Sequence, residues 1–375
     1  MAGKAPNLGV GMKEKRWFRL LWFLPLLLLL IFTNYFVDPA GIYKSDSQYM
    51  AASLLEGNNV YFHAGNGDER GIKRYLISEM PDFVDCVTVG PSLVFGVRAD
   101  AVQAESFYNL AVSGADFYDI LAQFGLMELY GKRCGRVVFC VDSYFFDEAL
   151  YSTFTRNETL KPYAEYMIGI LNGEHMRAPD DNAYARLKAK ASQLFSISYF
   201  QSALKWIGSS GVKEVLETIT AEENWGIAEA DYEGGYYMTD GSLVYPREVQ
   251  NNSAEYVQED ARNYDIETQF SKNGHISAYS QEMFEKLISY LSDRDVEVDL
   301  YLCPLAPSLW NRVDNEEYFI LKELEQYAND VAERYGLKIT GSYNPYNLNM
   351  TDADFYDSRH VRHELLATYF DFSAK

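Results

Sequence analysis

A serine and a distant Asp-x-x-His sequence are the residues of this chain best suited to catalysis. Ser92 follows a strand-like run that ends in Gly90-Pro91, and Asp357 and His360 lie close to the C-terminus. Serine is a weak nucleophile at neutral pH unless a base accepts its proton, and an imidazole serves best when a carboxylate holds it. We therefore predict that Ser92, His360 and Asp357 act as nucleophile, base and orienting carboxylate if the fold brings them together.

Five apolar runs separated by helical stretches indicate the scaffold that must position these residues. This alternation predicts an α/β fold with a five-stranded parallel sheet and helices on both faces. The carboxyl ends of parallel strands share one edge, where ligands bind. Ser92 follows the first run and Gly114 the second, Asp142 ends the third, and His360 follows the fifth, so all four are expected at that edge. The runs lie at residues 83–90, 106–112, 136–142, 296–303 and 337–340.

The alternation lapses between about residue 143 and residue 275. This region mixes helical stretches with a segment rich in tyrosine, glycine and acidic residues, at about 228–260. We interpret the region as a large, mostly helical insertion that covers the site as a lid or a substrate-facing cap.

The N-terminus predicts a membrane anchor. A basic tail at 1–16 precedes a long apolar stretch at 17–37, which is sufficient for one helical crossing. The basic residues orient the tail toward the cytoplasm and residues 38–375 toward the outside. A cleaved signal peptide is the alternative, but the bulky residues 34–38 offer no small-x-small cleavage site. We therefore favour an uncleaved anchor.

Charge and cysteine content exclude several classes of protein. The chain carries a formal net charge of −21, and an acidic body argues against nucleic-acid binding. Cys86, Cys140 and Cys303 lie in apolar strand-like runs, where cysteine usually behaves as a small buried hydrophobe. The cysteines and histidines do not follow zinc-ligand spacing, and no glycine-rich phosphate motif follows a predicted strand. We expect no metal and no cofactor.

Three blocks of the sequence resemble the SGNH/GDSL hydrolase superfamily. They are Gly90-Pro91-Ser92, the segment 109–114 and Asp357-Ser358-Arg359-His360. The likeness covers residues 83–142 and 279–371. It is closer to the membrane-anchored extracytoplasmic branch, which includes alginate O-acetylation proteins and the D-alanine transfer protein of teichoic acid operons.

This resemblance implies a flavodoxin-like three-layer fold and a Ser-His-Asp triad. It also implies that the backbone N–H groups of Ser92 and Gly114 point at the developing oxyanion. In the hydrolytic families an asparagine follows the third strand and completes the oxyanion hole. Here Asp142 occupies that place, with an oxyanion or substrate-binding role. An ionised carboxylate there opposes catalysis unless it is protonated, turned away or used for binding.

Two functional hypotheses follow. The first is a membrane-anchored, outward-facing esterase or O-acyltransferase that acts on a cell-surface polysaccharide or other glycan. In acyl transfer its partner would be a multi-spanning membrane acyltransferase; with water as acceptor the protein would be a deacetylase. The second is a catalytically silent module of the same fold that binds glycan or scaffolds an envelope assembly. Asp142 motivates this alternative, as does Pro91 in place of the aspartate or small polar residue usual before the serine.

Overall fold

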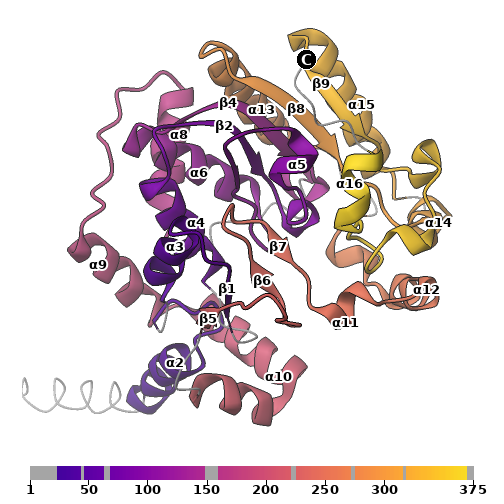
Figure 1. Ribbon diagram of the computed structural model, residues 1–375. Coiled ribbons are helices and arrows are strands. Elements are labelled where there is room, and N and C mark those ends of the chain that lie inside the picture. Colours follow the sequence, from indigo (N-terminus) through magenta and orange to yellow (C-terminus); the bar gives the residue numbers. More distant parts are fainter. Residues whose placement is uncertain are drawn as a thin grey trace, which may run out of the picture. The chain divides into compact units, whose positions relative to one another are not determined.

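The described residues of the computed structural model fall into two compact units. The smaller unit contains helices α2 (Leu24–Val37), α9 (Ala183–Gln193) and α10 (Ile197–Thr220), and the larger unit contains both sheets and the other helices (Figure 1). The structure describes residues 23–43, 46–62, 68–147, 159–220, 225–271, 275–315 and 318–369.

The larger unit is built on a five-stranded sheet in which every strand is parallel to its neighbours. The strand order is β3-β2-β4-β8-β9. Strand β2, which comes first in the chain among these five, therefore lies between β3 and β4. The predicted α/β class and five-stranded parallel sheet are confirmed. The strands are β2 (Phe83–Val89), β3 (Phe107–Asn109), β4 (Arg133–Cys140), β8 (Glu297–Leu302) and β9 (Lys338–Gly341).

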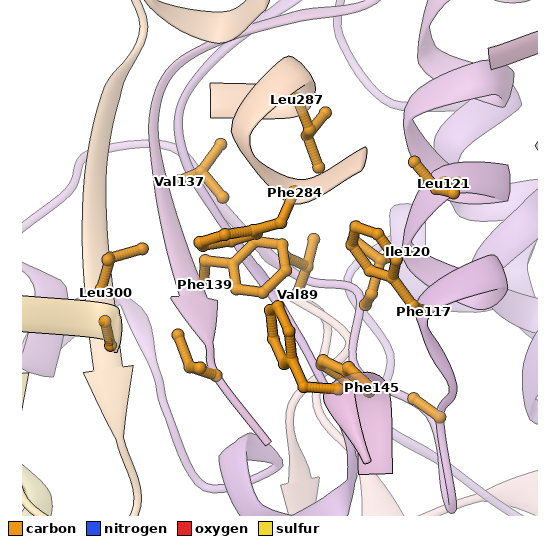
Figure 2. Close-up of a cluster of buried hydrophobic side chains, with 14 of the residues drawn as sticks. Val89, Phe117, Ile120, Leu121, Val137, Phe139, Phe145, Phe284, Leu287 and Leu300 are labelled. Atoms are coloured by element: carbon orange, nitrogen blue, oxygen red, sulfur yellow. The ribbon is translucent and has the colours of Figure 1, made fainter. Parts of the chain in front are cut away.

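One face of this sheet packs against long helices. Val137, Phe139 and Leu300 point from the strands toward Phe117 of α6 and Phe284 of α13 (Figure 2). Helix α6 has defined ends, because Asp116 and Asp119 form a capping box and Gly131 adopts a left-handed conformation. The helices on this face are α6 (Phe117–Tyr130), α7 (Ser143–Phe146), α8 (Lys161–Leu171), α13 (Ala278–Ser292), α14 (Pro307–Asn315) and α15 (Ile320–Tyr335).

The opposite face carries a second core. Successive residues of a strand point to opposite faces, so Cys86, Val138 and Tyr301 pack here. They meet the short helices α5 (Ala99–Val102) and α16 (His363–Tyr369), each of which lies a few residues after one of the two blocks predicted to be catalytic. The sheet is therefore covered on both faces.

A smaller antiparallel sheet, in the order β5-β1-β6-β7, belongs to the same unit. Three of its strands come from the region predicted to be a mostly helical insertion, so that region also contains strand pairing that its sequence did not predict. The strands are β1 (Val60–Phe62), β5 (Trp225–Ile227), β6 (Tyr236–Tyr237) and β7 (Leu243–Val244). The remaining elements are helices α3 (Ser47–Leu55), α4 (Glu69–Glu79), α11 (Arg247–Gln250) and α12 (Ala254–Asn263), and the 3₁₀ turns η1 (Ser92–Val94), η2 (Ile266–Thr268), η3 (Pro345–Leu348) and η4 (Asp352–Asp354).

Lys73 joins the two sheets. Its buried ammonium donates to the carbonyl of Asn109, at the end of β3 (2.7 Å), and to that of Gly241, in the β6–β7 turn. The backbone N–H of Asn109 also donates to Asp240 of the same turn, at 2.8 Å. Burial lowers the pKa of Lys73 to about 8, against the opposing charges of Glu69 and Asp240. These bonds hold the hairpin against the carboxyl edge of the parallel sheet.

Helix α2 is the described part of the predicted anchor. Residues 17–22 of that anchor, and the whole of the predicted tail 1–16, lie outside the described residues. Within the part of the chain that the structure describes, every helix falls short of the length or the apolarity that a membrane crossing requires.

Candidate active site

Ser92 is presented by a tight turn at the carboxyl end of β2. The strand ends at Val89, and Ser92 begins the 3₁₀ turn η1. Gly90 has a φ of 153°, and a Cβ at this position would lie 2.6 Å from the Cβ of Cys140. The turn therefore requires glycine, both for its backbone conformation and for its close approach to β4.

The Asn109 side chain holds this turn by hydrogen bonds to its backbone. Its amide donates to the carbonyls of Val94 and Val97, at 2.7 and 3.0 Å, and its oxygen accepts the N–H of Ala111 at 3.0 Å. Asn109 is fully buried. It belongs to the second resembling block, but its contacts make it a structural support for the segment that carries Ser92.

His360 and Asp357 lie in a short closed loop that precedes α16. Phe355 and Val361 form an antiparallel bridge across the base of this loop, and the N–H of Tyr356 donates to the carbonyl of His360 at 2.8 Å. Inside the loop, one Asp357 oxygen accepts the backbone N–H groups of Arg359 and His360, both at 2.8 Å. The backbone itself thus fixes the carboxylate beside the imidazole.

The structure brings these two segments together although they are 268 positions apart. His360 Nε2 lies 2.9 Å from Ser92 Oγ, and His360 Nδ1 lies 2.8 Å from the nearer oxygen of Asp357. Since a carboxylate can only accept, we assign the proton to Nδ1, which leaves Nε2 free to accept the serine O–H. The residues predicted as nucleophile, base and orienting carboxylate are therefore within hydrogen-bonding distance, in the order that acyl transfer would require.

The pKa of Asp357 is consistent with a carboxylate that supports His360 as a base. Burial raises the pKa of Asp357, but the attraction and hydrogen bond of His360, together with the two backbone N–H groups, outweigh it and lower the pKa to about 2. Asp357 is therefore ionised at any pH near neutrality. An ionised carboxylate at Nδ1 stabilises the imidazolium that forms when His360 takes up a proton.

Asp142 is engaged within the protein. One oxygen accepts the N–H of Tyr144 at 2.9 Å, and the other lies 3.1 Å from Nη2 of Arg359. Arg359 also donates to the hydroxyl of Tyr264, at 2.9 Å. The ion pair is largely shielded, with the two side chains 9% and 11% exposed. A guanidinium from the Asp-Ser-Arg-His block therefore balances the negative charge that seemed to oppose catalysis.

Gly114 lies in the loop between β3 and α6. It is exposed, with a φ of 53°, and its carbonyl lies 3.5 Å from a guanidinium nitrogen of Arg70. The adjacent Ser113 donates through its N–H and its hydroxyl to Glu69, at 2.6 and 2.9 Å. These contacts tie the loop to α4. The oxyanion role of Gly114 stays a prediction, as does a substrate-binding role for Asp142.

Tyr245 is a neighbour of the triad that the sequence did not reveal. Its ring packs against those of His360 and Tyr356, with centroid distances of 5.7 and 5.1 Å. Its hydroxyl oxygen is buried and has no hydrogen-bond partner among the described residues. Burial raises the pKa of Tyr245, and the charge of Asp357 adds to this effect. Tyr245 directly follows strand β7. The N–H of Leu243 in β7 donates to the carbonyl of Phe95 at 3.0 Å and fixes β7 beside the serine turn.

Comparisons with known proteins add no identification. No protein-family model matches the chain, and no curated protein sequence is detectably similar to it. Among the described residues, no cluster of three or more His, Cys, Asp or Glu side chains is placed to hold a metal ion. The functional argument therefore depends on the geometry of the site.

Proposed function

We propose that this protein is an SGNH-like serine esterase or O-acyltransferase that acts on a cell-surface polysaccharide or related glycan. The observation that carries the proposal is the continuous hydrogen-bonded path from Ser92 through His360 to Asp357. A turn serine that served only as a helix cap would have no need of a partly buried imidazole and carboxylate beside it. The chain order serine, aspartate, histidine and the position after the first parallel strand also agree with the resemblance of the three blocks.

The chemistry follows from the positions of the atoms. Ser92 Oγ attacks the carbonyl carbon of an acyl ester while His360 Nε2 takes the hydroxyl proton. The tetrahedral intermediate collapses, the C–O bond to the donor alcohol breaks, and His360 returns the proton to that alcohol. The acyl group is then an ester of Ser92. A second alcohol or a water molecule loses its proton to His360, attacks this ester and regenerates Ser92.

The pairing of Asp142 with Arg359 supports an active site rather than a silent one. An unpaired carboxylate beside the nucleophile would raise the energy of a developing oxyanion. Here the charge is balanced at 3.1 Å by Arg359, which stands between Asp357 and His360 in the sequence. This charge balance supports the proposal that the site is active.

The choice between transfer and hydrolysis depends on the acceptor. Transfer to a sugar hydroxyl would pair this protein with a multi-spanning membrane acyltransferase that supplies the acyl group. In this proposal residues 17–37 anchor the chain, residues 1–16 face the cytoplasm, and the body faces the outside. The basic residues of the tail before the apolar stretch support this orientation.

Serine-directed labelling tests the proposal directly. The full chain, purified in detergent, is exposed to a fluorophosphonate probe, and the modified residue is mapped by mass spectrometry. We expect a single modification at Ser92 that disappears in Ser92→Ala. A folded wild-type chain that stays unlabelled between pH 6 and 9 would contradict the proposal and favour the glycan-binding or scaffolding module.

A further inference from the structure

The smaller unit exposes an extended apolar surface on α9 and α10. Seven large hydrophobic side chains there are each at least 50% exposed. Exposed apolar patches of this extent mark a surface that contacts another apolar phase. We call these residues the α9–α10 apolar surface: Tyr184, Leu187, Phe195, Ile197, Leu204, Val212 and Leu216.

Polar residues occupy a different side of α10. Ile197 and Leu204 are seven residues apart and therefore lie on one side of the helix, whereas Ser202 and Lys205 lie on another. Ala203, between these sides, is buried against α2. The helix breaks at Gly211, where φ is 81°, so that its second arm begins anew and carries Val212 and Leu216. The first arm of α10 is therefore amphipathic.

The charge of this region differs from that of the rest of the chain. Residues 181–222 contain five Lys or Arg residues and four Asp or Glu residues, whereas the whole chain has a net charge of −21. A near-neutral, slightly basic segment can approach an anionic lipid surface that the acidic body would be repelled from.

The end of α2 is bound to the elbow between α9 and α10. The buried amide of Asn34 donates to three carbonyls at this elbow, those of Gln193 (3.0 Å), Leu194 (3.1 Å) and Ser196 (2.9 Å). Four residues later, Asp38 accepts the hydroxyl of Tyr199 at 2.6 Å. Val37 packs with Ala203 and Val215 of α10. The elbow is thus fixed to the residues at which the apolar stretch ends.

This attachment determines which phase the apolar surface meets. Helix α2 contains no charged residue between Leu24 and Val37, and in the proposed topology its last turn reaches the outer boundary of the bilayer. The elbow that is bound to that turn therefore lies at the same depth in the membrane. Tyr35, Tyr43 and Trp206 gather around this junction, and such rings are favoured where lipid tails meet headgroups.

We propose that the α9–α10 apolar surface lies in the interfacial layer of the lipid bilayer, beside α2, as a second membrane contact. The inference rests on the proposed anchor, and its occupant is lipid rather than a protein partner. Amphipathic helices bind such interfaces through the buried area of their apolar side together with attraction to anionic headgroups.

Depth-dependent quenching in nanodiscs tests this inference on the full chain. The four native cysteines are buried, so a single introduced cysteine can carry an environment-sensitive fluorophore. Leu204→Cys and Leu216→Cys report on the apolar surface, and Ser202→Cys reports on the polar side of the same helix. Tyr256→Cys, which is 48% exposed on α12, serves as the control in the larger unit. Leu27→Cys reports on α2, and the discs contain phosphatidylcholine with phosphatidylglycerol.

Brominated lipids are expected to quench the labels at 204 and 216 at least about twofold and to leave those at 202 and 256 nearly unchanged. Quenching at 27 without quenching at 204 and 216 would overturn the inference and leave the anchor intact. Absence of quenching at position 27 would instead contradict the proposed anchor, and the inference that rests on it would fall as well. Protection of 204 and 216 from both lipid and aqueous quenchers would indicate a protein occupant and would also overturn the inference.

Discussion

The two edges of the parallel sheet differ in a way that matters for locating function. The amino edge contains two cavities, one of about 650 Å³ lined by Phe124, Met127 and Tyr290, and one of about 180 Å³ near Glu297 and Lys338. The carboxyl edge contains the triad and the Asp142–Arg359 ion pair. The presence of a cavity therefore does not by itself locate the edge that brings Ser92, His360 and Asp357 together.

The charged groups of the two edges are used differently. At the amino edge Lys132 pairs with Asp82 at 3.0 Å, and Arg294 lies 3.8 Å from Glu128, so these ions neutralise one another near the surface. At the carboxyl edge an ionised carboxylate is placed behind an imidazole that faces a hydroxyl. The order of hydrogen-bonded groups, rather than the size of a cavity, therefore favours the carboxyl edge as the proposed active site.

Removal of the nucleophile should have the largest effect. Ser92→Ala is expected to abolish fluorophosphonate labelling, because the attacking oxygen is gone. Ser113→Ala is the matched control, since Ser113 is an exposed serine bonded to Glu69. Labelling that persisted in Ser92→Ala and vanished in Ser113→Ala would place the reactive serine elsewhere on this edge.

Loss of the base should have the next largest effect. His360→Gln is expected to slow labelling by about 10⁶-fold, because no group then accepts the serine proton. His363→Gln is the control, because His363 is bonded to Tyr356 rather than to Ser92, and it should retain most of the wild-type rate. Equal losses in both variants would indicate damage to the loop rather than loss of a base.

Asp357→Asn should slow labelling less, by about 10⁴-fold, because His360 would remain but in the wrong tautomer. The pKa of Asp357 is about 2 in the folded chain, below its ordinary value of about 3.9. The folded state therefore binds fewer protons than the unfolded state, and the stabilisation is complete above about pH 4 and lost as the pH falls toward 2.

Chemical denaturation at several pH values measures that stabilisation. We expect wild type to exceed Asp357→Asn by about 1–2 kcal/mol at pH 5, with a difference that narrows as the pH falls toward 2. A difference that stayed constant over this range would show that Asp357 is not held as an ionised partner of His360.

Substitutions of Tyr245 should have a smaller effect on labelling, and two of them distinguish the role of the ring from that of the hydroxyl. Tyr245→Phe should label within about twofold of wild type, because the hydroxyl that it removes has no partner among the described residues. Tyr245→Ala should label about tenfold more slowly, because His360 loses the ring packed against it. A large loss in the phenylalanine variant would assign the hydroxyl a direct role.

Changes at the amino edge should have the smallest effect. Lys132→Ala and Tyr290→Phe alter residues that line the larger cavity, and both should label at rates within about twofold of wild type. Circular dichroism would verify that the variants fold. Abolished labelling in a folded amino-edge variant would break the distinction between the two edges.

Local patterns in the sequence were sufficient for much of the scaffold and for the triad. The strand runs at 83–90 and 296–303 and the helical stretch at 117–130 are predictable because apolar periodicity reports burial. Ser92 and His360 could be matched because parallel strands deliver their carboxyl ends to one edge, whatever lies between them in the chain.

Contacts between segments without a shared pattern were decided by the tertiary structure alone. The pairing of Asp142 with Arg359 joins residues 217 positions apart, and strand β1 pairs with β5 more than 160 residues later. Tyr245 reaches His360 only because the β6–β7 hairpin is bonded to the serine turn through Leu243.

The physical reason for this difference is the distance along the chain between the residues that interact. Periodicity and turn chemistry are local, so residue types and spacings determined the parallel strands, their helices and the order of the catalytic groups. Ion pairs and ring packing between distant segments depend on distances that exist only after the chain has folded, so the charge balance beside Ser92 and the aromatic neighbour of His360 were decided in three dimensions.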